Sequence, residues 1–169
     1  YIDLKPIVSG ENALIGNDYV VISKPVKRLN SKAVFSPEEI QGLKEQPFVL
    51  RLGEFTPAQY KIMGSIDING MGMSTYMFFE AIPDAFMDVK SKEWKFKQSK
   101  HKVPIVIPRN YLNLYNFGFS QTSEQLPQIT ESMMKDLELE LTLSGDNHSQ
   151  KFVGKVVGFT DRLNTILVP

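Results

Sequence analysis

Residues 137–143 alternate leucine with a polar residue at every step, and this pattern restricts the fold more than any other in the chain. The leucines occupy every second position and are separated by Glu138, Glu140 and Thr142. A two-residue period is that of a β-strand with one buried face and one face in water. The Ser-Gly-Asp-Asn turn at 144–147 follows, and apolar residues return at 152–159. The segment therefore predicts a β-hairpin.

The clearest helix signal lies at residues 36–46. Ser36 can cap the helix, Pro37 suits its first turn, and Glu39 can complete a capping box. The helix should end before Pro47, which disfavours helical geometry at the preceding residue. Buried strands are predicted on either side, at residues 20–22 and 48–50, so the region predicts a β-α-β unit.

The other patterns predict short elements joined by polar turns. We expect strands at residues 60–68, 75–82, 103–107 and 165–168, a turn at 69–72, and short helical segments at 55–60, 83–87 and 109–116. The predicted fold class is α+β, a strand-dominated mixed sheet with few, short helices.

Composition limits the class of protein. The chain has 169 residues, 42% hydrophobic and 22% charged, which suits one folded domain of ordinary size. Lys+Arg and Asp+Glu number 19 each, and a net charge of zero weighs against a nucleic-acid binder. The absence of cysteine excludes disulfides, thiol catalysis and thiolate metal sites. No apolar run approaches the ~18 residues that a membrane helix needs.

The motifs that could carry chemistry have simpler structural explanations. Gly70 and Gly72 have the Gly-x-Gly spacing of a nucleotide loop, but no third glycine or Gly-Lys-Ser/Thr follows, and a turn explains them. His101 and His148 lack ligand-pair spacing. Glu138 is expected on the wet face of its strand. We assign no catalytic, cofactor-binding or metal-ligating residue, although a site assembled in space, such as a Ser-His-Asp triad, stays open.

Residues 90–102 (KSKEWKFKQSKHK) hold six lysines interleaved with Trp94 and Phe96. One interpretation is a basic, aromatic surface for nucleic acid or anionic lipid headgroups. The other is a strand or hairpin in which both aromatic residues face inward and the lysines face water. The alternation and the zero net charge favour the second interpretation, and a membrane-surface contact remains as the alternative.

Residues 109–120 (RNYLNLYNFGFS) are dense in aromatic side chains. They could belong to the core, or they could line a groove for a sugar or a peptide. Aromatic residues beside asparagines also suit an interface. We predict that this segment contacts a partner through Tyr111, Tyr115, Phe117 and Phe119.

Three stretches together resemble the periplasmic core domain of MacB-like and FtsX-like ABC transporter permeases. The first, "FSPEEIQGLKEQPFV" (35–49), is similar to the family's capped helix followed by Leu-x-x-x-Pro-x-Val, here Leu43, Pro47 and Val49. The second, "IPDAFMDV" (82–89), is similar to the family's middle segment. The third, "KFVGKVVGFTDRLNTILVP" (151–169), resembles its closing strands. "PRNYLNLYNFGFS" (108–120) also resembles an uncharacterised branch of FtsX-like permeases.

The resemblance implies a single extracytoplasmic domain over residues 1–169, with a small β-rich insert at about 55–82. Such a domain lies between two transmembrane helices of a permease subunit, on the periplasmic face of the cytoplasmic membrane. It carries out no catalysis and needs no cofactor, because a separate cytoplasmic ATPase hydrolyses ATP. It passes the motion of the membrane helices to a substrate or partner outside, and the parent permease is expected to be dimeric.

Two other functions remain as alternatives. One is a free-standing extracytoplasmic binding module for a peptide, lipid or glycan, and the other is an enzyme with a spatially assembled site. The permease hypothesis expects apolar runs of about 20 residues just outside both ends of this segment, which also explains why the chain begins at Tyr1. A secreted module would have a signal peptide and no later spans, and an enzyme would show converging polar groups in a pocket.

Overall fold

The computed structural model describes residues 2–4, 19–24, 34–68, 70–96, 101–121, 127–146 and 148–169. The chain forms two compact units, Tyr1–Glu54 and Phe55–Pro169, which we call unit 1 and unit 2. Strands predominate and the helices are short, so the predicted α+β class is confirmed.

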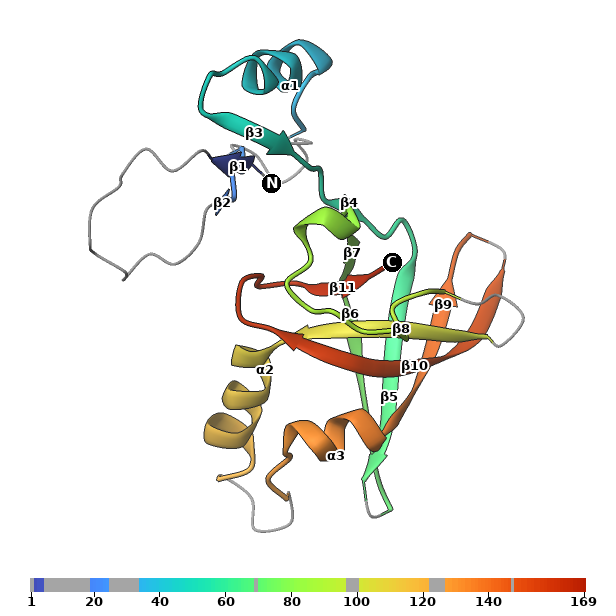
Figure 1. Cartoon of the computed structure of the whole chain (residues 1–169). Coiled ribbons are helices and arrows are strands. Elements are labelled where there is room, and N and C mark those ends of the chain that lie inside the picture. Colours follow the sequence, from blue (N-terminus) through green and yellow to red (C-terminus); the bar gives the residue numbers. More distant parts are fainter. Residues whose placement is uncertain are drawn as a thin grey trace, which may run out of the picture. The chain divides into compact units, whose positions relative to one another are not determined.

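In its described residues, unit 1 is a small three-stranded sheet with one helix (Figure 1). The strands are β1 (Ile2–Leu4), β2 (Tyr19–Val20) and β3 (Val49–Leu52), in the order β2-β1-β3. β1 is antiparallel to both neighbours, so β2 and β3 run in the same direction with β1 between them. The helix α1 (Pro37–Lys44) connects β2 to β3. The predicted β-α-β unit is therefore present, with an unpredicted strand inserted in its middle.

The capping box of α1 is confirmed. The Glu39 amide donates to Ser36 Oγ at 3.3 Å, and the Ser36 amide donates to Glu39 Oε2 at 2.7 Å. Lys24 Nζ also donates to Glu39 Oε2, at 2.5 Å. This hydrogen bond, together with the one from Ser36, lowers the pKa of Glu39 below its usual value. The helix ends with Glu45 as its C-cap, before Pro47 as predicted.

The prediction that the strands of this unit are buried was wrong. Val20, Phe48 and Leu50 are exposed, and no hydrophobic residue is fully buried in the described part of unit 1. The physical reason is size, because one two-turn helix can cover only part of one face of a three-stranded sheet.

Unit 2 is built on an eight-stranded mixed sheet that curls on itself (Figure 1). The β8–β10 and β7–β11 pairs are parallel, and the other pairs are antiparallel. In spatial order the strands are β4 (Thr56–Pro57), β7 (Phe79–Ala81), β11 (Ile166–Val168), β8 (Lys102–Pro108), β10 (Ser149–Thr160), β9 (Glu138–Ser144), β5 (Lys61–Ile68) and β6 (Met71–Met77).

The predicted hairpin of residues 137–159 is confirmed as β9 and β10, which are antiparallel. Leu139 and Leu141 are buried, while Glu138 and Glu140, which alternate with them, are exposed. Glu138 and Glu140 form ion pairs with Lys102 and Lys151, at 2.7 and 2.9 Å. The period-two pattern therefore identified both faces of this strand.

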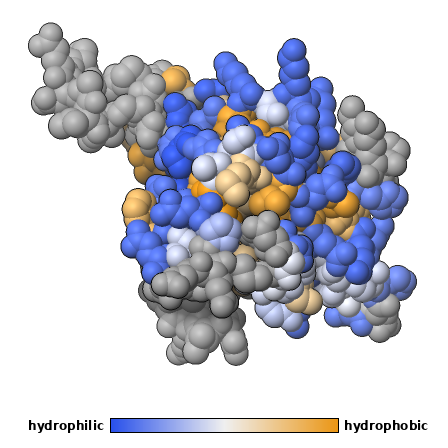
Figure 2. Space-filling view, turned by 90° about the horizontal axis from the view of Figure 1, so that it is seen from below, coloured by the Kyte–Doolittle hydropathy of each residue, from blue (hydrophilic) through white to orange (hydrophobic). Residues whose placement is uncertain are grey.

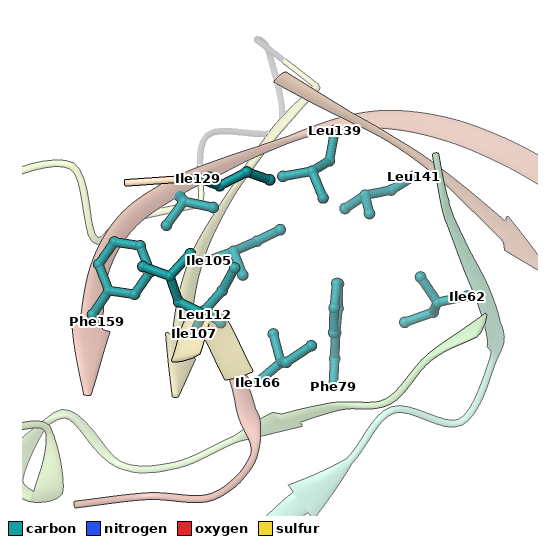
Figure 3. Close-up of a cluster of buried hydrophobic side chains, with 11 residues drawn as sticks. Ile62, Phe79, Ile105, Ile107, Leu112, Ile129, Leu139, Leu141, Phe159 and Ile166 are labelled. Atoms are coloured by element: carbon teal, nitrogen blue, oxygen red, sulfur yellow. The ribbon is translucent and has the colours of Figure 1, made fainter. Parts of the chain in front are cut away.

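The core of unit 2 lies on the inner face of the curled sheet. Figure 3 shows side chains from β5, β7, β8, β9, β10 and β11 and from α2 pointing toward one another, among them Ile105 and Leu141, which are completely buried. The buried cluster consists of Ile62, Phe79, Ile105, Ile107, Leu112, Ile129, Leu139, Leu141, Val156, Phe159 and Ile166.

Short helices lie at one end of this sheet (Figure 1). α2 (Arg109–Leu114) follows β8 directly and continues as a π-helix over Tyr115–Phe119. α3 (Glu131–Asp136), which the sequence did not predict, is capped by Thr130 and leads into β9. A 3-10 turn, η1 (Asp84–Phe86), matches the short helix predicted after Pro83. In the described part of the chain, no helix has the length and apolarity needed to cross a membrane.

Residues 55–82, predicted as a β-rich insert, contribute β4–β7 to the main sheet. Two local predictions within this region were wrong. The helical turn expected near Thr56 is a short strand, because Thr56 pairs with Ala81 and the Ala58 amide donates to the Phe79 carbonyl. The strand expected at 75–82 is two strands, β6 and β7, which belong to opposite halves of the sheet and are separated by Phe78.

Candidate functional site

An apolar pocket of about 360 Å³ opens into the inner face of the unit 2 sheet. Figure 2, which looks at the molecule from below, shows hydrophobic side chains at the surface between hydrophilic ones. Several lining residues also belong to the buried core, so the pocket reaches from the surface into the interior. It is lined by Ile66, Met73, Thr75, Tyr76, Met77, Phe78, Ile107, Tyr111, Leu112, Tyr115, Ile129, Met134, Leu139, Thr165 and Ile166.

The β5–β6 hairpin forms one wall of the pocket. Cross-strand partners share a face of the sheet, and the register pairs Ile66 with Met73 and Ile62 with Met77. Side chains alternate between the two faces along each strand, so these four residues all point toward the core. Gly64 lies on the same face, where a Cβ atom would come within 2.2 Å of Met77 Sδ. Glycine at this position therefore lets the Met77 side chain lie across β5.

The helical segment after β8 forms the opposite wall. The Tyr111 hydroxyl donates to the Asn164 carbonyl oxygen at 3.1 Å, and the Tyr115 hydroxyl donates to the Pro127 carbonyl oxygen at 3.2 Å. Because both hydroxyl groups are held by backbone carbonyls, the two rings are fixed while they contribute their apolar carbon surface to the pocket.

Asn116 fastens a third part of the wall. Its Nδ2 donates to the Ile129 carbonyl oxygen at 2.8 Å, and its Oδ1 accepts from the Ile129 amide at 2.8 Å. The side-chain amide therefore acts toward Ile129 as a neighbouring strand would. This contact holds Ile129, which is almost fully buried, between the π-helix and α3.

Among the residues that the structure describes, no charged side chain lines the pocket. An ion-pair network lies at the start of α2, where Arg109 bridges Glu131 and Asp161, and none of these three residues is among the lining residues. The described lining residues offer neither a carboxylate nor an imidazole for acid–base chemistry. What the pocket can do chemically is bind apolar groups, with a few hydroxyls around them.

The structure brings together only part of the predicted contact set. Tyr111, which is 43% exposed, and the partly buried Tyr115 both line the pocket. Phe117 is 71% exposed and is not a lining residue. The backbone of Phe119 ends the π-helix, and its side chain lies outside the described part of the structure.

Sequence reasoning missed the strand side of the pocket. Methionines at positions 71, 73 and 77 follow a two-residue period, and this signal was divided between a predicted turn and a predicted strand. Phe78, which is 82% exposed, was taken as the interior of a strand. Ile129 and Met134 carried no sequence signal, because their segment showed no clear period.

The lysine-rich segment gave a mixed outcome. Trp94 faces inward as predicted, being 8% exposed, and its Nε1 donates to Asp84 Oδ1 at 3.1 Å. Phe96 is exposed, and residues 90–96 form no strand, so those parts of the prediction were wrong; residues 97–100 lie outside the described part. A second hollow of about 420 Å³ is lined by Lys92, Glu93, Lys95, Lys102, Pro104, Lys155 and Val157.

Two of the lysines around this second hollow are already paired. Lys102 contacts Glu138 at 2.7 Å, and Lys155 contacts Glu93 at 3.0 Å. His101 and His148 are exposed, and the described residues contain no cluster of His, Asp and Glu side chains suited to a metal ion. The apolar pocket is therefore the strongest candidate site.

Comparison with protein families gives one match. The family model "PCD-like: Probable transporter periplasmic core domain" matches residues 20–169. No curated protein and no solved structure gives a significant match to this chain.

Proposed function

Because the chain belongs to the family of probable transporter periplasmic core domains, we propose that it couples the motion of a permease's transmembrane helices to a substrate or partner protein outside the membrane. Membership of this family supports a periplasmic location and a role in transport. The proposal adds a mechanism, in which the domain transmits movement and catalyses no reaction. It also adds the partners, which are a cytoplasmic ATPase acting through the membrane helices and a dimeric ABC-type permease resembling MacB and FtsX.

The observation that carries this proposal is the apolar pocket. A domain that transmits movement needs a rigid body and a surface on which the moving partner is held. The β8–β10 centre of the sheet is buried and closely packed, with Ile105, Val106 and Val156 almost completely inaccessible. The pocket opens beside this centre, and it has an apolar lining with exposed aromatic residues at its rim, as interfaces commonly have.

The predicted contact residues can now be assigned roles within the proposal. Tyr111 and Tyr115 belong to the pocket wall, and Phe117 extends the aromatic surface along the same helical segment. We expect Tyr111 and Phe117 to contact the external partner directly, since both are exposed. Tyr115 is partly buried and hydrogen-bonded, so its role is to shape the pocket.

A free-standing binding module for a peptide, lipid or glycan is the second candidate function. The same pocket supports it, because about 360 Å³ of apolar space lies in the usual range for a ligand site. Its lining favours a peptide or a lipid over a glycan, which would require many directed hydrogen bonds.

Reading the parent gene separates the two candidates. The permease proposal requires an apolar stretch of about 20 residues before Tyr1 and another after Pro169. A signal peptide followed by no further span would instead support the free-standing module and overturn the coupling proposal.

The coupling itself is tested in the full-length permease with its ATPase. We expect Tyr111→Ala and Phe117→Ala to reduce transport at least fivefold while ATP hydrolysis continues. The reason is that contact with the external partner is lost, whereas the cytoplasmic ATPase is unchanged. Asn113→Ala, an exposed change on the same helix, is the matched control. Transport at the normal rate in both variants would refute the assigned contact surface.

A further inference from the structure

The two edges of the unit 2 sheet differ in a way that points to a binding site. The β4 edge is two residues long and contains Pro57, which cannot donate a backbone hydrogen bond. The β6 edge is seven residues long and contains neither a charged residue nor a proline. Within the described part of the chain, β6 has one neighbour, β5. Short strands and prolines are common protections against unwanted pairing, so β4 is protected and β6 is open.

The register of the hairpin shows which backbone groups the open edge presents. Ile68 pairs with Met71 across two intervening residues, and the closing pair of such a hairpin is hydrogen-bonded. Hydrogen-bonded and non-hydrogen-bonded pairs alternate, so Gly72, Ser74 and Tyr76 direct their N–H and C=O groups away from β5. The 2.9 Å contact between the Ser65 and Ser74 hydroxyls agrees with the closer approach of a non-hydrogen-bonded pair.

The open edge borders the apolar pocket. Met73, Thr75 and Met77 lie on the inner face of β6 and line the pocket, while Tyr76 and Phe78 stand at its rim, 66% and 82% exposed. A strand added to β6 would therefore direct every second side chain into the pocket. Because the described lining residues are all uncharged and most are apolar, we expect those side chains to be uncharged and apolar.

From these two features together we infer that β6 and the apolar pocket bind an extended peptide segment of a partner protein, with apolar side chains at alternate positions, by adding it as a ninth strand. A lipid chain would fill the pocket but leave the amide groups of β6 to water. A peptide satisfies both features, since its backbone pairs with the edge and its side chains enter the pocket. The inference rests on the proposed function, because it specifies the chemistry of the external partner.

The first test is direct binding to the 169-residue chain. The probes are fluorescein-labelled ten-residue peptides in which Val, Leu, Ile or Phe alternates with Thr, and the measurement is fluorescence anisotropy. We expect at least one peptide to bind with a Kd below about 100 μM, which corresponds to roughly −5.5 kcal/mol. N-methylation of the amides on either the threonines (antiparallel addition) or the apolar residues (parallel addition) should weaken this binding at least tenfold.

Paired variants separate the edge from the pocket. Ser74→Pro removes one outward N–H and should weaken the peptide at least tenfold, whereas Ser74→Ala removes only the hydroxyl and should change binding less than threefold. Thr75→Lys places a charge on the inner face of β6 and should weaken peptide binding as much as Ser74→Pro does. Thr75→Val, which has nearly the same shape as threonine, is its control. Circular dichroism of each variant checks that the sheet is retained, and increased protection of the Gly72, Ser74 and Tyr76 amides from hydrogen exchange checks the binding mode.

Three results would overturn the inference. One is that no peptide binds at 1 mM, or that neither N-methylated series binds more weakly. Another is that a fluorescent fatty acid binds and is displaced by none of the peptides, which would assign the pocket to lipid. The third is a stable dimer that Ser74→Pro dissociates, which would make a second copy the occupant. None of these results affects transport coupling in the full permease, so a failure here is distinguishable from a failure of the proposed function.

Discussion

Removal of the Asn116 side chain should loosen one wall of the apolar pocket by a predictable amount. Asn116→Ala deletes both 2.8 Å hydrogen bonds to the Ile129 backbone. Each such bond contributes about 1 kcal/mol net, and a buried backbone group left without a partner costs somewhat more. Ile129 is only 3% exposed, so water cannot easily replace the lost partner. We therefore expect a loss of about 2–3 kcal/mol in the free energy of unfolding of unit 2.

The single tryptophan provides the assay. Trp94 is buried in unit 2, so its fluorescence during urea unfolding follows this unit. The urea concentration at the midpoint of unfolding should fall. The slope of the unfolding free energy against urea concentration should stay constant, because the surface exposed on unfolding hardly changes. For a chain of this size the melting temperature should fall by roughly 4–12 °C.

Asn113→Ala is the matched control, since Asn113 is exposed on the preceding turn of α2. It should change stability by less than about 0.5 kcal/mol. If Asn116→Ala were as stable as this control, the Asn116–Ile129 pair would not fasten the wall, and the explanation of how the pocket is held open would fail.

Three further changes test other parts of the fold. Gly154→Ala should destabilise unit 2 by about 1–3 kcal/mol in urea unfolding, because its Cβ would meet Ile105 Cδ1 at 2.7 Å in a packed core. Ser36→Ala should reduce the stability of α1 by about 1 kcal/mol, seen as a loss of helical circular dichroism at lower urea. The hydrogen bond from Lys24 lowers the folded-state pKa of Glu39. The stability that the ionised Glu39 side chain contributes is therefore complete above its unfolded-state pKa, and it is lost as the pH falls through the folded-state pKa. Lys24→Met should reduce that pH dependence in a circular-dichroism titration, and an unchanged titration would count against the pairing.

The elements that could be predicted from the sequence are those specified by neighbouring residues. The β9–β10 hairpin needs only a period of two and a turn, and the capping box of α1 needs only Ser36 and Glu39. Both are local, so both were found. The prediction of buried strands in unit 1 failed because burial depends on what covers a strand, and the sequence of Leu50 and its neighbours does not state this.

The pocket could not be predicted because its residues come from eight separate segments, between Ile66 and Ile166. The parallel β8–β10 and β7–β11 pairs, which bring these segments together in one sheet, join strands distant in the chain and have no local sequence signal. Two of the four predicted contact residues, Tyr111 and Tyr115, line the pocket. They could be found because a run of aromatic residues after a buried strand is a local sequence pattern. The Asn116–Ile129 contact could not be predicted from the sequence, because nothing in the neighbouring residues distinguishes Asn116 from a solvent-exposed asparagine.

The distribution of side-chain types across the sheet bears on how a binding domain could also transmit movement. The centre of the sheet is filled by branched residues such as Ile105, Leu141 and Leu167, which are inaccessible and have few rotamers. The pocket walls contain branched residues too, but they also contain Met73, Met77 and Met134, whose unbranched side chains adapt to different neighbours at little cost. An occupant can therefore be accommodated by rearranging methionines, without displacing the β8–β10 centre. In the coupling mechanism that we propose, a force applied to the occupant would then pass to the packed centre of the sheet.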